Sequence, residues 1–221
     1  MPTLTHNSCF AVHNSGTLQN VNSYDQLWEA GVTFGNRAGV AEEDRANQKG
    51  MLFEVFTEFF MNMFSDTIGV HSIRNTSDDQ YHYGTDFYGK NPNNEEVLIQ
   101  VKAYDAGHKL LRKDLVTFID RADELDVPKA RRILFTSAVS EGENGVFEFG
   151  WGKDRMTVYD RRRQQQLIDN AVDFWQRFRD AVAAAKGDPD ANTAWGELFL
   201  EKHNRAEAAT SFRAALASDA D

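Results

Sequence analysis

An aspartate and a glutamine–lysine pair lie in the stretch GTDFYGKNPNNEEVLIQVKAY, residues 84–104. Asp86 belongs to one apolar run, and Gln100 and Lys102 belong to the next, with a segment rich in Asn, Pro and Gly between them. Apolar runs separated in this way are typical of two β-strands joined by a turn. Because residues i and i+2 of a strand share a face, the spacing predicts that Gln100 and Lys102 point toward one site, beside Asp86.

Hydrolysis of a phosphodiester is the chemistry that these residue types fit. A divalent cation must offset charge on the phosphoryl oxygens and lower the pKa of a water molecule. Mg²⁺ takes oxygen ligands, usually one or two carboxylates with water and phosphate in the remaining positions. Asp86 supplies a carboxylate, and the Lys102 ammonium can orient the attacking water and stabilise developing negative charge. A β-hairpin with ordinary polar residues on a solvent-facing side is the alternative, because an Asp followed by QxK is common by chance.

Helical and extended segments alternate around this stretch. Apolar residues recur at helical spacing in residues 47–64, which predicts a strongly buried helix. Further helices are predicted at 23–31, capped by Ser23, at 111–125 and at 161–186. Strands are predicted at 69–75, 85–89, 96–104, 131–137, 145–151 and 155–160. The mixture predicts an α/β protein with a sheet flanked by helices, preceded by a loose polar arm over residues 1–20.

Several of these segments resemble the PD-(D/E)XK nuclease superfamily, and more closely its Mrr-like restriction endonuclease branch. NQKGMLFEVFTEFF (47–60) resembles the leading helix of that group, and QVKAYDAGHKLLRKDLVTFID (100–120) resembles the strand and helix that close its site. RRILFTSAVS (131–140) is similar to the next core strand, and the resemblance covers residues 47 to 180. That branch often carries glutamine in place of the second acidic residue, which is where Gln100 stands.

The resemblance implies a restriction-endonuclease-like three-layer α/β/α core with a mixed central sheet. Asp86 would be the principal metal ligand, and the Gln100 side-chain oxygen and the Val101 carbonyl would complete the protein ligands. The leading helix of the family offers a glutamate to the metal, and Glu54 is the matching residue, with Glu58 one turn later as the alternative.

The predicted activity is that of a Mg²⁺-dependent DNA endonuclease, with Mn²⁺ as a substitute, serving restriction or another form of phage defence. Lys102 would position the nucleophilic water. Lys109, Arg112 and Lys113 lie just past the proposed site and are predicted to meet DNA phosphates, although a solvated helix start explains them equally well. Two alternatives remain: a catalytically degenerate nuclease fold that acts as a scaffold or interaction module, which the neutral Gln100 keeps open, and an RNA- or structure-specific nuclease with the same core.

Composition narrows the classes of protein. The 221 residues include 41% hydrophobic residues, enough for a sizeable core, and carry a net charge of −10, which argues against wholesale nucleic-acid binding. Tight DNA binding would then depend on a partner, another domain or an oligomer. The single cysteine, Cys9, excludes an intramolecular disulfide and a Cys-based zinc cluster, so a reducing cytoplasm is the simplest location. No apolar run is long enough to cross a membrane, and no P-loop motif for an NTPase motor occurs.

The chain is predicted to have three parts. Residues 1–46 form an N-terminal arm and short helix, residues 47–186 form the nuclease-like domain, and residues 189–221 form a helical hairpin after the GDPD segment at 187–190. The hairpin resembles one tetratricopeptide repeat, in Trp195-Gly196, Phe199, Ala208, Phe212 and Ala215. Because a single repeat cannot bury its apolar face, these helices are expected to contact the nuclease-like body, a protein partner or a second copy of the chain. A simple helical hairpin is the alternative.

Overall fold

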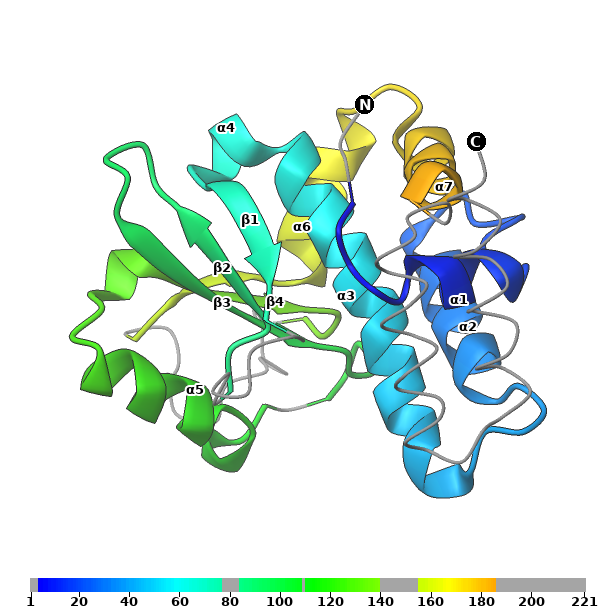
Figure 1. The fold of residues 1–221 in the computed structure, drawn as a ribbon, viewed down its shortest axis with the longest axis horizontal. Coiled ribbons are helices and arrows are strands. Elements are labelled where there is room, and N and C mark those ends of the chain that lie inside the picture. Colours follow the sequence, from blue (N-terminus) through cyan, green and yellow to red (C-terminus); the bar gives the residue numbers. More distant parts are fainter. Residues whose placement is uncertain (1–3, 77–83, 109, 140–154, 186–221) are drawn as a thin grey trace, which may run out of the picture. The chain divides into compact units, whose positions relative to one another are not determined.

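A computed structural model describes residues 4–76, 84–108, 110–139 and 155–185 (Figure 1). The described residues fall into two compact units, one drawn from Met1–Phe59 with Asp173–Asp221 and the other from Phe60–Val172. The repeat-like segment at 189–221 and the strand predicted at 145–151 lie outside the described residues. The predicted division at residues 187–190 lies outside them too.

The second unit is built on a five-stranded mixed sheet with the strand order β1-β2-β3-β4-β5. Strands β1, β2 and β3 pair antiparallel, whereas β3, β4 and β5 pair parallel. Their bounds are β1 His71–Asn75, β2 Phe87–Lys90, β3 Glu96–Lys102, β4 Arg132–Thr136 and β5 Thr157–Tyr159. The α/β class, the mixed sheet and the β2–β3 hairpin are therefore confirmed.

Strand β3 is buried along both faces. Its five inner residues are all buried, and Gln100 is only 3% exposed. A central strand with a strand on each side and covered faces has no solvent side, so the alternative of a hairpin with a solvent-facing polar side is wrong. Gln100 pairs with Leu134 of β4, so a strand that is distant in the sequence contributes to its burial.

The crossover between the parallel strands β3 and β4 contains helix α5 (Arg112–Glu124), which covers one face of the sheet. The helix predicted at 111–125 is confirmed, and its Leu115, Phe118 and Ile119 are buried against Leu98 and Leu134. On the other face, the Phe60 and Phe135 rings lie 5.9 Å apart between centroids.

The predicted helix at 161–186 is two helices, α6 (Arg161–Asp169) and α7 (Phe174–Ala185). Asp173 between them has a φ of +56°, a left-handed conformation that a right-handed helix cannot continue through. The break coincides with the boundary between the two units. Asp160 caps α6 by accepting a hydrogen bond from the Arg163 N–H at 2.9 Å.

The first unit is helical and has an aromatic core. It holds α1 (Cys9–Asn14), α2 (Tyr24–Gly35), most of α3 (Arg45–Met63) and α7. The predicted burial of α3 is confirmed, since Phe56 and Phe59 are fully buried and contact Phe174 and Phe178 at centroid distances of 5.3–6.1 Å. Ser23 caps α2 as predicted, with its side chain accepting from the Gln26 N–H at 3.2 Å.

The N-terminal segment is not a loose arm, contrary to the prediction. Leu4, His6 and Ser8 are buried, and α1 packs against α7. A few apolar residues, such as Val12, fix this segment even though it is polar overall.

Short elements complete the fold. These are α4 (Ser65–Ile68) and two 3₁₀ turns, Glu42–Asp44 and Lys129–Arg131. None of the helices in the described ranges is long and apolar enough to cross a membrane.

Candidate active site

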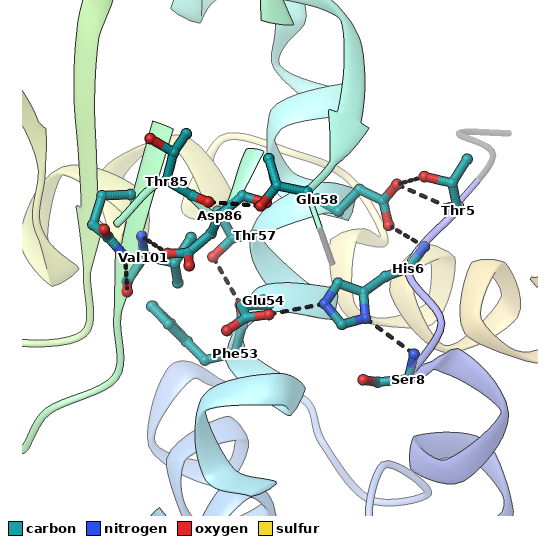
Figure 2. Close-up of polar contacts among 12 residues, drawn as sticks. Thr5, His6, Ser8, Phe53, Glu54, Thr57, Glu58, Thr85, Asp86 and Val101 are labelled. Carbon is teal, nitrogen blue, oxygen red and sulfur yellow. Dashed lines mark hydrogen bonds and ion pairs between the residues drawn. The ribbon is translucent and has the colours of Figure 1, made fainter. Parts of the chain in front are cut away.

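Asp86 lies immediately before β2 and faces β3 through its carboxylate. Its Oδ2 atom accepts a hydrogen bond from the Val101 N–H at 2.6 Å (Figure 2). The same oxygen accepts one from Nε2 of Gln100. The Asp86 N–H donates in turn to the Ile99 carbonyl at 2.9 Å, so the main chain is already paired at this point. The structure thus brings together three of the predicted site residues, Asp86, Gln100 and Val101.

The Gln100 amide lies between two oxygens. Besides Asp86, its Nε2 atom donates to the Val101 carbonyl oxygen at 3.3 Å. The nitrogen and oxygen of a glutamine amide have nearly the same shape, and a half-turn of the amide exchanges them. Gln100 can therefore present either a donor or an oxygen ligand toward Asp86 without any movement of the main chain.

Lys102 is the last residue of β3 and is half-buried. By the alternation of a strand, its side chain lies on the same face as Gln100. In the parallel ladder it pairs with Thr136, and its carbonyl oxygen accepts a hydrogen bond from the Ser137 N–H at 3.2 Å.

Thr76, just past the end of β1, holds the main chain at Asp86. Its hydroxyl lies 2.6 Å from the Thr85 carbonyl oxygen and 3.0 Å from that of Asp86. Its N–H also donates to the Asp86 carbonyl at 3.0 Å. Thr76 is 3% exposed and carries no motif, so the sequence contained no signal for this role.

Gly84 brings the chain into Asp86 along the surface of α5. Its φ is +68°, and a Cβ atom there would lie 2.7 Å from the Phe118 nitrogen and 2.9 Å from the Thr117 carbonyl carbon. Only glycine fits both the backbone conformation and this approach. The glycine before the aspartate therefore has a structural reason to be there.

The loop after Lys102 is organised around Asp114, in the first turn of α5. Asp114 Oδ2 accepts from the Leu111 N–H at 2.9 Å, and His108 Nε2 lies 3.9 Å away from the same oxygen. The rings of Tyr104 and His108 stack at 3.9 Å. Burial raises the pKa of the Tyr104 hydroxyl, and the negative charge of Asp114 and a hydrogen bond to it raise that pKa further.

The predicted DNA-contact residues are only partly described. Arg112 and Lys113 are exposed in the first turn of α5, within the unit that holds Asp86. Lys109 lies outside the described residues. A role for all three at DNA stays a prediction.

Glu54 lies on α3 in the first unit, where it contacts the N-terminal segment. Its Oε2 atom lies 2.9 Å from His6 Nε2 (Figure 2). The other ring nitrogen, Nδ1, accepts a hydrogen bond from the Ser8 N–H at 3.0 Å, so the hydrogen of a neutral ring sits on Nε2 and points at Glu54. Sequence reasoning missed His6, because a contact across 48 positions leaves no local pattern.

Glu58, the alternative to Glu54, is fully engaged by the N-terminal segment. It is 1% exposed and accepts from the Thr5 N–H at 2.9 Å, the Thr5 hydroxyl at 2.6 Å and the His6 N–H at 3.0 Å. The Glu54 side chain is 28% exposed by contrast. Of the two glutamates, Glu54 is therefore the one whose side chain is accessible to solvent.

The donor set around Asp86 fits a hard divalent cation. Within the described residues, no group of three or more His, Cys, Asp or Glu side chains is placed to hold a metal ion. A site here would therefore combine one carboxylate with amide and carbonyl oxygens, and Asp86, Gln100 and Val101 supply these within hydrogen-bonding distance of one another. One carboxylate with further oxygen ligands is a usual set of protein ligands for Mg²⁺.

Comparisons with known proteins add no assignment. No family model matches the chain, and neither a curated protein nor a solved structure matches it. A function is therefore argued from the residues and contacts of the chain itself.

Proposed function

We propose that this chain is a Mg²⁺-dependent endonuclease that hydrolyses phosphodiester bonds in DNA, with Mn²⁺ as a substitute cation. One observation carries the proposal: the Asp86 carboxylate contacts both Gln100 and the Val101 N–H, on the strand that ends at Lys102. An acid at the start of one strand, with an oxygen-bearing amide and a lysine on the neighbouring strand, supplies groups that metal-assisted hydrolysis uses.

The order of elements supports the proposal. A buried helix, α3, precedes the strands that carry Asp86 and the Gln100–Lys102 pair, and α5 and β4 follow. This is the order that the resemblance to PD-(D/E)XK nucleases of the Mrr-like branch implies. The three-layer restriction-endonuclease-like core and the C-terminal helical hairpin are part of the proposal.

Each residue has a separate role. Asp86, the side-chain oxygen of Gln100 and the Val101 carbonyl would hold the cation, which when bound would offset phosphate charge and lower the pKa of a water molecule. Lys102 would orient the attacking water and stabilise the charge that develops on the phosphoryl oxygens. Glu54 is proposed as the additional acid on the leading helix, a role that its exposure favours over that of Glu58.

The distribution of charge bears on how the chain would bind DNA. Arg112 and Lys113, both exposed, and Lys109 are proposed to meet DNA phosphates. The net charge of −10 means that a partner must strengthen DNA binding, either another protein or a second copy of the chain through the C-terminal helices. We place this activity in the cytoplasm, in restriction or another form of phage defence.

A catalytically degenerate nuclease fold is the second candidate, and one observation favours it. Asp86 Oδ2 already accepts two hydrogen bonds from the protein, which is how a purely structural carboxylate is satisfied. In that case the chain would act as a scaffold or interaction module.

The test is cleavage of supercoiled DNA, linear DNA and RNA in Mg²⁺, Mn²⁺ or EDTA. Wild-type protein is expected to cut DNA only with a cation, and Asp86→Ala and Lys102→Ala are expected to lose this activity. Asp120→Ala, on the exposed face of α5, and Lys129→Ala, in the exposed turn before β4, are matched controls that should cut as wild type does.

Two results would overturn the proposal. They are a wild type that cuts no substrate under any of these conditions, and Asp86 or Lys102 variants that cut as well as wild type. Cleavage of RNA in place of DNA would move the assignment to an RNA nuclease with the same residues.

A further inference from the structure

The Ser137 hydroxyl lies between the two main-chain polar groups of Tyr104. It accepts a hydrogen bond from the Tyr104 N–H at 2.7 Å and donates one to the Tyr104 carbonyl oxygen at 2.5 Å. The Ser137 N–H donates to the Lys102 carbonyl at 3.2 Å. Ser137, directly after β4, therefore makes three hydrogen bonds to residues 102–104.

These bonds extend the pairing of β3 and β4 past the end of the sheet. The regular parallel ladder ends at the Lys102–Thr136 pair. Beyond it the serine side chain takes the place of a main-chain partner, and the Val139 N–H then pairs with the Ala106 carbonyl at 3.0 Å. Two residues after Lys102, at Tyr104, the chain is thus bonded to the β4 segment through one hydroxyl group.

We propose that Ser137 is a positioning residue for the Lys102 ammonium, an inference that rests on the proposed nuclease function. A lysine has a flexible four-carbon stem, so the direction in which it leaves the strand is what the main chain can fix. Ser137 fixes that direction at two points: its N–H donates to the carbonyl of Lys102, and its hydroxyl bonds both main-chain polar groups of Tyr104, two residues later. A misplacement of about 1 Å in a catalytic group costs on the order of 100-fold in rate.

Ser137 does not act on the substrate itself. The side chain is 1% exposed, and its hydroxyl both donates and accepts within the protein. The effect of the hydroxyl must therefore pass through the main chain at Tyr104, two residues after Lys102.

The experiment compares Ser137→Ala, which removes the hydroxyl, with Ser137→Thr, which keeps it, and Ser137→Cys, whose slightly larger thiol forms only weak hydrogen bonds. We expect Ser137→Ala to lower kcat for DNA by about 10- to 100-fold with KM changed less than about twofold, because the lost interaction matters in the transition state. Mn²⁺ binding, followed by titration calorimetry, should stay within about twofold of wild type, since the Ser137 side chain bonds none of the proposed ligands. Ser137→Thr should restore kcat if it folds, and Ser137→Cys should fall between the two.

A double-mutant cycle with Lys102→Ala separates positioning from general stability. Single-turnover rates at excess enzyme should show no further loss when Ser137→Ala is added to Lys102→Ala, because both variants disable the same group. Ser15→Ala, which removes a hydroxyl bonded to the Val12 carbonyl and to Thr17 in the first unit, is the control and should keep wild-type kcat.

The outcomes distinguish this inference from the proposed function. A wild type that cleaves nothing removes the proposed function and the inference together. An active wild type beside a Ser137→Ala enzyme with unchanged kcat overturns the inference alone. So does a kcat loss matched by an equal loss of Mn²⁺ binding, or one that adds in full to that of Lys102→Ala.

Discussion

The Nε2 atom of His6 lies 2.9 Å from Oε2 of Glu54, although the two residues are 48 positions apart. The opposite ring nitrogen is held by the Ser8 N–H, so the imidazole is fixed at both ends. The first described residues of the chain thus set the orientation of the one glutamate on α3 that keeps exposed surface.

We expect His6→Ala to lower the free energy of unfolding by about 1–3 kcal/mol, because it leaves the buried Ser8 N–H without its partner. His6→Asn should recover part of this loss, since its side-chain oxygen takes the place of Nδ1 and can accept from the Ser8 N–H. Urea unfolding measures both, with His71→Ala on the exposed edge strand β1 as a control that stays within about 0.5 kcal/mol of wild type. A His6→Ala midpoint equal to that of wild type would show that the imidazole contributes nothing to folding.

Glu54→Gln and Glu58→Gln are expected to have different effects, one mainly on the cleavage rate and the other mainly on stability. Glu58→Gln weakens an acceptor of three hydrogen bonds in a buried place, so it should lower the free energy of unfolding by about 1–3 kcal/mol. Glu54→Gln should change stability less and reduce the metal-dependent cleavage rate more. Unfolding and cleavage measured on the same preparations decide the point, and the reverse pattern would assign the acidic role to Glu58.

The parts of the fold that the sequence predicted are those whose burial follows a local period. Helix α5 repeats its apolar residues at helical spacing, and the β2–β3 hairpin joins two apolar runs through a turn. The Asp86–Gln100 contact follows from that hairpin, because the pairing of Phe87 with Ile99 places the two side by side.

What the sequence did not predict depends on distant partners or on one unusual residue. The contact of His6 with Glu54 and the anchoring of Asp86 by Thr76 join separate segments, so neither leaves a periodic pattern. The end of α6 was missed because neither Gly nor Pro marks it, and Asp173 adopts a positive φ there. The sequence left open whether Gln100 faces solvent, because β4, the strand that pairs with it on its other side, lies beyond α5.

Gly84→Ala should destabilise the second unit by about 2–4 kcal/mol. The left-handed φ of +68° costs a residue with a Cβ about 1–2 kcal/mol, and the clash with the α5 backbone at 2.7 Å adds strain. Gly107→Ala is the matched control, because a Cβ there would meet nothing within 4 Å and its φ is not positive. The thermal unfolding midpoint of Gly84→Ala should be clearly lower than that of Gly107→Ala. Equal midpoints would contradict the close approach of Gly84 to α5.

The raised pKa of Tyr104 predicts a loss of stability at alkaline pH. Below pH 10.0, its ordinary value, the hydroxyl is protonated in both folded and unfolded chains. Above it the unfolded chain loses the proton first, so the free energy of unfolding falls as the pH rises toward the folded pKa. Asp114→Asn removes a charge that raises this pKa and keeps an acceptor for the Leu111 N–H, so the Tyr104 pKa should fall but stay above 10.0 because of burial.

Carbon-13 NMR of labelled tyrosine follows this titration, with Tyr104→Phe to assign the resonance. Tyr159 is the internal control, because burial raises its pKa too while Arg163 opposes the rise and Asp114 is not involved. An Asp114→Asn protein in which the Tyr104 pKa stays where it was would remove Asp114 as a cause.

Gln100→Glu separates the two functions proposed for the Asp86 site. In EDTA the new carboxylate would face Asp86 Oδ2 where an amide now donates, and two adjacent like charges, one of them buried, should lower the free energy of unfolding by about 1–3 kcal/mol. With Mg²⁺ or Mn²⁺ the same two carboxylates become a stronger oxygen site, and a cation that binds only the folded chain should restore the unfolding midpoint. Gln166→Glu, exposed on α6 of the same unit, should respond to neither condition. A Gln100→Glu protein that is destabilised in EDTA and stays so at saturating Mn²⁺ would favour the scaffold, because Asp86 and residue 100 would then interact with each other and not with a metal.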